Sequence, residues 1–79
     1  MKKVSEISCY NRAVGKRIKA ARESAGLFQR EAADKLKVDR TTYTRYEMGA
    51  LEMSYLRLVN FSKITRTSID DLLEVVDAE

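Results

Sequence analysis

The chain has 79 residues, of which 44% are hydrophobic and 34% charged, and its formal net charge is +3 at pH 7. This composition is typical of one small globular domain and excludes a disordered chain. No apolar run exceeds two residues, and there is no histidine, no phosphate-binding glycine loop and no metal-ligand cluster. We therefore expect no membrane span or secretory signal, no enzyme, no cofactor and no metal site.

The first helix is predicted over about residues 12–24, after an N-terminal arm at residues 1–10 whose conformation the sequence does not indicate. Asn11 is the expected N-cap of this helix. Its buried face is indicated by apolar residues at helical spacing: Val14, Ile18, Ala21 and Ala25. Gly15 lies inside the helix, where glycine costs about 1 kcal/mol relative to alanine. Such a glycine is tolerable if another backbone approaches closely there.

The second and third helices are predicted over about residues 29–36 and 40–48, with a short turn between them. Ala32 and Ala33 lie in the second helix, and small residues let another helix cross closely. Gly49 follows the third helix as a left-handed C-cap would.

The third helix is built from threonines and tyrosines, which favour strands by intrinsic propensity. On a helix with a cap at Asp39, however, Tyr43 and Tyr46 share one face. The opposite face, within about 140°, carries only cationic and short polar residues: Arg40, Thr41, Thr44 and Arg45. A strand would mix the two classes, so the pattern favours a helix. Short hydroxyls let this face lie close to a surface, and arginines can make bidentate contacts with bases or phosphates.

A fourth helix is predicted from a cap at Ser54 to about Ile64. A fifth is predicted from the capping-box-like sequence at residues 68–71 to about Val76. The expected architecture is therefore all-α, with five helices.

The charge is unevenly distributed along the chain. Residues 1–45 carry twelve Lys and Arg against five Asp and Glu, and residues 46–79 carry three against seven, so their net charges are +7 and −4. The first part should attract polyanions such as nucleic acid, although a solvated face of uneven charge would look the same. The single Cys9 cannot form an internal disulfide, which suits a reducing cytoplasm.

Several motifs follow one another in a fixed order along about sixty residues. They are "VG" and Ile18, Arg22, "GL.Q" at Gly26–Gln29, Ala33, Val38, "YE.G" at Tyr46–Gly49, and the closing "S.D.L". In this order and spacing they resemble the lambda-repressor-like helix-turn-helix family of Cro and Xre type. The resemblance implies a compact five-helix DNA-binding domain over residues 11–79, with the helix-turn-helix formed by the second and third helices.

The resemblance also implies three sets of functional residues. The base-reading positions of the recognition helix are matched by Arg40, Thr41 and Arg45, with Thr44 as a nearby candidate. By the resemblance Gln29, at the start of the second helix, contacts a DNA phosphate. The cations Arg30 and Lys37 are expected to contact phosphates as well, although Lys37 is not part of the family pattern. Arg22 and Glu47 match a partly buried ion pair that joins the first helix to the end of the third.

The chain departs from the family pattern at three places. Phe28 replaces the Ser or Thr that usually caps the second helix, and Lys37 replaces the usual glycine of the turn. The loop after Gly49 lacks the lysines and arginines with which many relatives contact phosphates. Apolar residues without an obvious place in the core predict instead a dimer interface at Leu51, Met53, Val75 and Val76.

The leading interpretation is a sequence-specific transcriptional regulator, with repression favoured, that binds a pseudo-palindromic operator in double-stranded DNA as a homodimer. At this length we expect no ligand-sensing domain. The alternative is an antitoxin-like or anti-regulator module whose main partner is another protein. A helix-turn-helix fold used only for protein assembly is a third interpretation.

Overall fold

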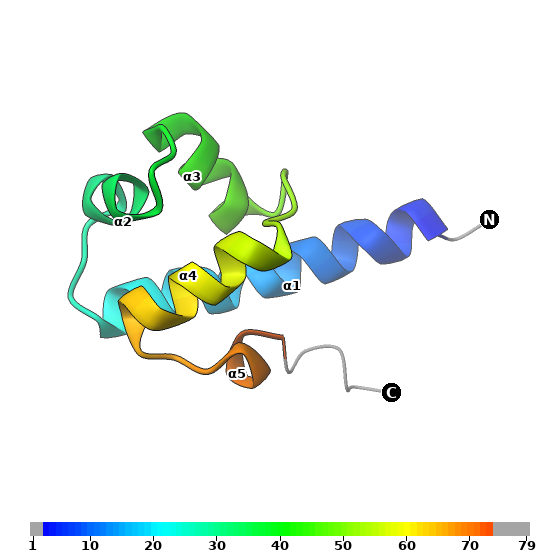
Figure 1. The fold of residues 1–79 in the computed structure, drawn as a ribbon. Helices are drawn as coiled ribbons and strands as arrows, with labels where there is room; N and C mark the ends of the chain where they lie inside the picture. Colours follow the sequence, from blue (N-terminus) through cyan, green and yellow to red (C-terminus); the bar gives the residue numbers. More distant parts are fainter. Residues whose placement is uncertain (1–2, 74–79) are drawn as a thin grey trace.

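The computed structural model describes residues 3–73, with side chains described from Tyr10 onwards (Figure 1). Every element in this range is a helix, so the predicted all-α architecture is confirmed. The elements are α1 (Lys3–Ser24), α2 (Gln29–Leu36), α3 (Arg40–Met48), α4 (Tyr55–Thr65) and α5 (Ile69–Leu73). No helix within residues 3–73 combines the length and the apolar character needed to cross a bilayer.

The start of α1 differs from the prediction. The helix begins at Lys3, so the expectation of a start near residue 12 with Asn11 as its N-cap is wrong. Residues 3–11 contain no proline or glycine that would break a helix, and Asn11 lies within its regular turns. Figure 1 shows these first turns extending beyond the other helices. The division of the chain into an arm at residues 1–10 and a domain from residue 11 stays a prediction.

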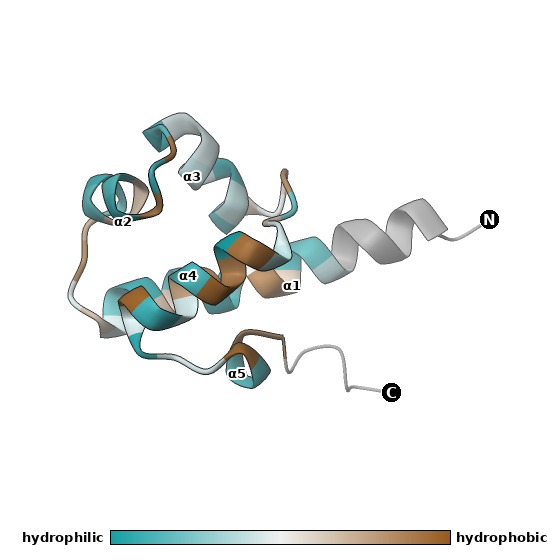
Figure 2. Cartoon of the chain, in the orientation of Figure 1, coloured by the Kyte–Doolittle hydropathy of each residue, from teal (hydrophilic) through white to brown (hydrophobic). Residues whose placement is uncertain are grey.

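The core lies where α1, α3, α4 and α5 meet. Its largest fully buried side chains are Ile18, Tyr43, Phe61 and Leu72, one from each of these helices. The rings of Tyr43 and Tyr46 pack edge to face, with centroids 6.4 Å apart, which is a favourable geometry for an aromatic pair. In Figure 2 apolar colours gather along α4, whereas α2 is mostly hydrophilic. The aromatic face of α3 therefore points inward, and this part of the prediction is confirmed.

Two glycines allow α1 to cross the end of α3 at close range. A Cβ on Gly15 would lie 2.5 Å from the carbonyl oxygen of Glu47 and 2.7 Å from that of Tyr46. A Cβ on Gly49 would lie 2.6 Å from the Cα of Arg12, and Gly49 has a φ of 77°, in the left-handed region. The close backbone approach expected at Gly15 is confirmed.

We expect a Gly15→Ala variant to be less stable than the wild type by about 1–3 kcal/mol, because its methyl group would overlap two backbone carbonyls. The better helix propensity of alanine offsets about 1 kcal/mol of the strain. Urea denaturation measures the difference. Ala20→Gly, at an exposed position of the same helix, is the control for propensity alone. A Gly15→Ala variant as stable as the wild type would contradict the close crossing.

Candidate nucleic-acid interface

The turn between α2 and α3 closes without a glycine. Lys37 adopts the left-handed conformation, with φ 62° and ψ 41°. The backbone N–H of Val38 then donates to the carbonyl oxygen of Ala33 at 3.0 Å, which is the closing bond of a Schellman motif. This conformation costs a non-glycine residue about 1–2 kcal/mol. The result is a short turn that leaves the side chain of Lys37 exposed beside the start of α3.

The N-terminus of α2 is capped by a residue that the sequence analysis did not single out. The carboxylate of Glu31 accepts a hydrogen bond from the backbone N–H of Phe28 at 2.8 Å. The side chain of Phe28 makes no capping bond and is exposed. Phe28, which replaces the usual Ser or Thr, therefore supplies no side-chain cap, and Glu31 provides one half of a capping box.

The outer face of α3 is exposed as predicted. Arg40, Thr41 and Arg45 are exposed, Thr44 is half-buried, and Tyr43, Tyr46 and Glu47 are buried. Neither Arg40 nor Arg45 forms an ion pair with any residue in the described part of the chain. Two unpaired guanidinium groups therefore stand on either side of short hydroxyl groups on one helix face.

The start of α3 is held by a local bond rather than by a backbone cap. Asp39 occupies the N-cap position, but its side chain accepts no backbone hydrogen bond of a cap. It accepts instead from the hydroxyl of Thr42 at 2.6 Å, and this bond lowers the pKa of the Asp39 carboxyl. The helical wheel places Thr42 between the two faces of α3, and its hydroxyl serves to bind Asp39.

A buried ion pair joins α1 to α3. Arg22 Nε donates to Glu47 Oε2 at 2.6 Å, and Arg22 Nη2 donates to Glu47 Oε1 at 3.3 Å. A third bond, from Arg22 Nη1 to the carbonyl oxygen of Leu27 at 2.9 Å, fixes the loop that leads into α2. The pair implied by the resemblance is thus present, and Arg22 holds both α3 and the entry to α2.

The ion pair sets the protonation of its surroundings. Burial alone would raise the pKa of Glu47, but the hydrogen bonds it accepts, the one from Arg22 foremost, lower that pKa below its ordinary value. Burial, reinforced by the Glu47 carboxylate, raises the pKa of the neighbouring Tyr43. The hydroxyl of Tyr43 has no hydrogen-bond partner among the described residues. Near neutral pH the site therefore holds an ionised Glu47 and a neutral Tyr43.

Gln29 connects this pair to the outer face of α3. Its Nε2 donates to Glu47 Oε1 at 3.0 Å, and its Oε1 accepts from the Thr44 hydroxyl at 3.4 Å. The amide is therefore turned toward α3 as well as lying at the N-terminus of α2. No local pattern in the sequence indicates this link, because residues 29 and 47 meet only in the folded chain.

One exposed residue of the outer face, Met48, is not among the residues predicted from the sequence. Met48 is 64% exposed and lies one helical turn after Thr44 on the same face. The spacing of four residues from Thr44 would have identified it. Met48 is neither polar nor cationic, so the residue types that predict DNA contacts do not include it.

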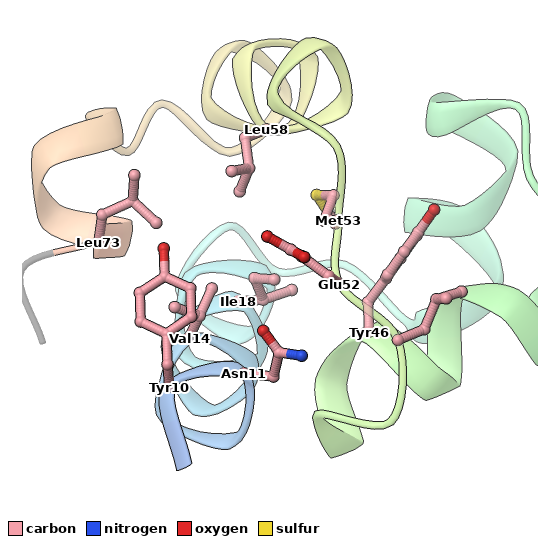
Figure 3. Close-up of a pocket in the computed structure, with 10 residues that line it drawn as sticks. Tyr10, Asn11, Val14, Ile18, Tyr46, Glu52, Met53, Leu58 and Leu73 are labelled. Atoms are coloured by element: carbon pink, nitrogen blue, oxygen red, sulfur yellow. The ribbon is translucent and has the colours of Figure 1, made fainter. Parts of the chain in front are cut away.

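Two of the four expected dimer residues, Leu51 and Met53, lie within the described part of the chain, and they differ in exposure. Met53 is 5% exposed and belongs to the core, so the expectation that it is free for a partner is wrong. Figure 3 shows Met53 and Leu58 lining a small pocket. The pocket has a volume of about 30 Å³ and lies between α1 and the loop before α4. Leu51 is exposed, as are Tyr55 and Leu56, which the prediction did not include. Val75 and Val76 lie outside the described residues.

Comparisons with known proteins agree with this arrangement. A family model described as "Helix-turn-helix" matches residues 18–72. Among curated Bacillus subtilis proteins, the uncharacterized HTH-type transcriptional regulator YqaE is 42% identical over 57 residues, which cover 72% of this chain and 49% of that protein. The HTH-type transcriptional regulator ImmR is 37% identical over 60 residues, covering 76% of this chain and 47% of ImmR. The SPbeta prophage-derived uncharacterized HTH-type transcriptional regulator YonR is 37% identical over 65 residues, covering 82% of this chain and 60% of YonR. The chain thus spans about half the length of the curated relatives it matches.

Proposed function

Because the chain belongs to the helix-turn-helix family of Cro/C1 and Xre type, we propose that it is a sequence-specific DNA-binding transcriptional regulator. The observation that carries the proposal is the outer face of α3, where Arg40 and Arg45 are exposed and unpaired. The opposite face of the same helix is fixed in the core by Tyr43 and Tyr46. A rigid helix with such a face fits the major groove, which is about 12 Å wide. None of the three relatives is named as an enzyme.

In this proposal base contacts and phosphate contacts come from different elements. Arg40 and Arg45 donate paired hydrogen bonds to guanine O6 and N7, and Thr41 and Thr44 contact neighbouring bases. The N-terminus of α2 receives a phosphate, with Gln29, Arg30 and Lys37 beside it. Since Gln29 Nε2 already donates to Glu47, its remaining amide hydrogen is the group left for that phosphate. Phosphate contacts set the register in which the outer face of α3 is read.

The regulator acts as a homodimer on a pseudo-palindrome. The support is an apolar surface, by which we mean three exposed apolar side chains close together in the sequence, Leu51, Tyr55 and Leu56, on the loop before α4 and its first turn. A symmetric dimer would place its two recognition helices about 34 Å apart, one turn of DNA. Such a protein, by occupying an operator, excludes others from the same duplex, and we therefore favour repression.

The same apolar surface supports a second candidate function. An antitoxin-like or anti-regulator module would use Leu51, Tyr55 and Leu56 to hold another protein. Exposed apolar groups that lie close together are typical of protein interfaces. The two functions differ in what occupies this surface and not in how α3 meets DNA.

Selection of bound sequences from a random duplex pool tests the proposal. We expect enrichment of an inverted repeat whose half-sites lie about 10 base pairs apart, centre to centre, and binding that weakens steeply with salt. Enrichment of a single half-site would favour the second candidate. A pool without any enriched sequence would refute sequence-specific recognition.

We expect Lys37→Ala to weaken binding to all duplexes alike and to reduce the slope of log Kd against log salt concentration by about one unit. The substitution removes one exposed charge from the turn but keeps a residue with a Cβ in the left-handed conformation. Fluorescence anisotropy at several salt concentrations measures the slope. Lys63→Ala, which removes an exposed charge from α4 outside the helix-turn-helix, should leave it unchanged. An unchanged slope for Lys37→Ala would remove that residue from the interface.

A further inference from the structure

The outer face of α3 contains a shallow hollow that its polar residues do not explain. Its volume is about 420 Å³, and it is lined by Arg40, Thr41, Thr44, Arg45, Met48 and Ala50. Met48 is the largest apolar side chain in it and is exposed, so it contributes little to the core. An exposed methionine in the middle of a cationic face is a feature that folding alone does not require.

The helical wheel places Met48 between the two arginines. At 100° per residue, starting from Arg40 at 0°, Met48 lies at about 80° and Arg45 at about 140°. Met48 lies eight positions after Arg40, which is about 12 Å along the helix axis. Met48 is therefore on the reading face, at the end of the hollow away from Arg40, and would meet a different base pair from the one that Arg40 meets.

Thr44 adds to the apolar character of this hollow. Its hydroxyl donates to Gln29 Oε1 at 3.4 Å. With its hydroxyl hydrogen used in that bond, Thr44 can still offer DNA its methyl group and the acceptor lone pairs of its hydroxyl oxygen. Ala50, exposed after the C-cap Gly49, adds a second methyl to the lining.

In the major groove the apolar group on a base edge is the C5 methyl of thymine. Flanking phosphates would be attracted to Arg40 and Arg45, which favours a duplex over an apolar protein as the occupant of this hollow. We propose that Met48, with Ala50 and the methyl of Thr44, forms a receptor for thymine methyl groups, so that Met48 determines specificity at the C-terminal end of α3. This inference rests on the proposed DNA-binding function.

The test replaces thymine by deoxyuridine, which lacks only the C5 methyl, at each thymine of the selected half-site in turn. For the wild type, we expect at least one position at which uracil weakens binding about four-fold, the effect of one buried methyl group. In Met48→Ala, this ratio of Kd values should fall below about two-fold, and Met48→Leu should restore most of it. Lys63→Ala shortens an exposed side chain of α4, outside the helix-turn-helix, and should leave the ratio unchanged.

The possible results separate this inference from the proposed function. If the domain selects a site but no thymine in it responds to uracil, or if Met48→Ala keeps the full ratio, the inference is overturned while DNA recognition stands. A selected half-site without thymine would also overturn it. If no duplex is selected at all, both the inference and the proposed function fall.

Discussion

Replacing Glu47 with alanine is expected to destabilise the folded chain by about 3–5 kcal/mol. The substitution leaves the buried guanidinium of Arg22 without its carboxylate, and an uncompensated buried charge is costly. In a domain of this size, the loss corresponds to a fall in Tm of about 12 to 40 °C. Thermal denaturation followed by circular dichroism measures it.

Glu23→Ala is the matched control, because Glu23 also lies near Arg22, at 3.8 Å, but its side chain is mostly exposed. We expect this variant to stay within about 0.5 kcal/mol of the wild type. The double variant Arg22→Met with Glu47→Leu should recover part of the stability, since an apolar pair leaves no buried charge. If Glu23→Ala and Glu47→Ala lowered the free energy of unfolding equally, the buried ion pair would contribute no more to stability than the exposed one.

The same pair predicts the dependence of stability on pH. The folded chain holds the pKa of Glu47 below its ordinary value, so the unfolded chain binds this proton first as the pH falls. The contribution of Glu47 is therefore complete above the ordinary glutamate pKa, about 4.3, and is lost as the pH falls through the lower folded value. Between pH 6 and pH 3, we expect the Tm of Glu47→Gln to change less than that of the wild type.

Alanine at Arg40 or at Arg45 is expected to reduce discrimination between the selected site and unrelated duplex about 5- to 150-fold. A good bidentate base contact is worth about 1–3 kcal/mol of discrimination. Both arginines are exposed and unpaired within the described part of the chain, so their removal should not change the helical content. Competition binding against a scrambled duplex measures discrimination, and circular dichroism measures helicity.

Arg66→Ala serves as the control, since it removes an equal charge from the C-cap of α4, outside the helix-turn-helix. It should weaken specific and unspecific duplexes by a similar, small factor. Full discrimination in both the Arg40→Ala and the Arg45→Ala variant would mean that the outer face of α3 is not the reading face.

The sequence predicts most reliably those features that depend on a periodic spacing of residue types within one helix. The two faces of α3 follow from helical spacing within nine residues, and the buried Tyr43 and Tyr46 bear this out. The predicted start of α1 was wrong because Asn11 is a residue type that often caps helices. No residue between Lys3 and Asn11 breaks a helix, so the helix begins earlier. Met53 was misplaced because a loop has no periodicity that separates inside from outside. The bond from Gln29 to Glu47 depends on how α2 and α3 cross, which local spacing does not encode.

The strict separation of the two faces of α3 has a consequence for how this chain can diverge. Arg40, Thr41, Arg45 and Met48 are all exposed, and surface substitutions away from special features usually change stability by less than about 0.5 kcal/mol. With the reading face that we propose, target preference is thus free to drift with little risk to folding. Glu47 and Gln29 have no such freedom, because one carboxylate serves both the core and the geometry of the outer face. Duplicated copies of this gene are therefore expected to specialise at the exposed positions of α3 while keeping the same pair beneath them.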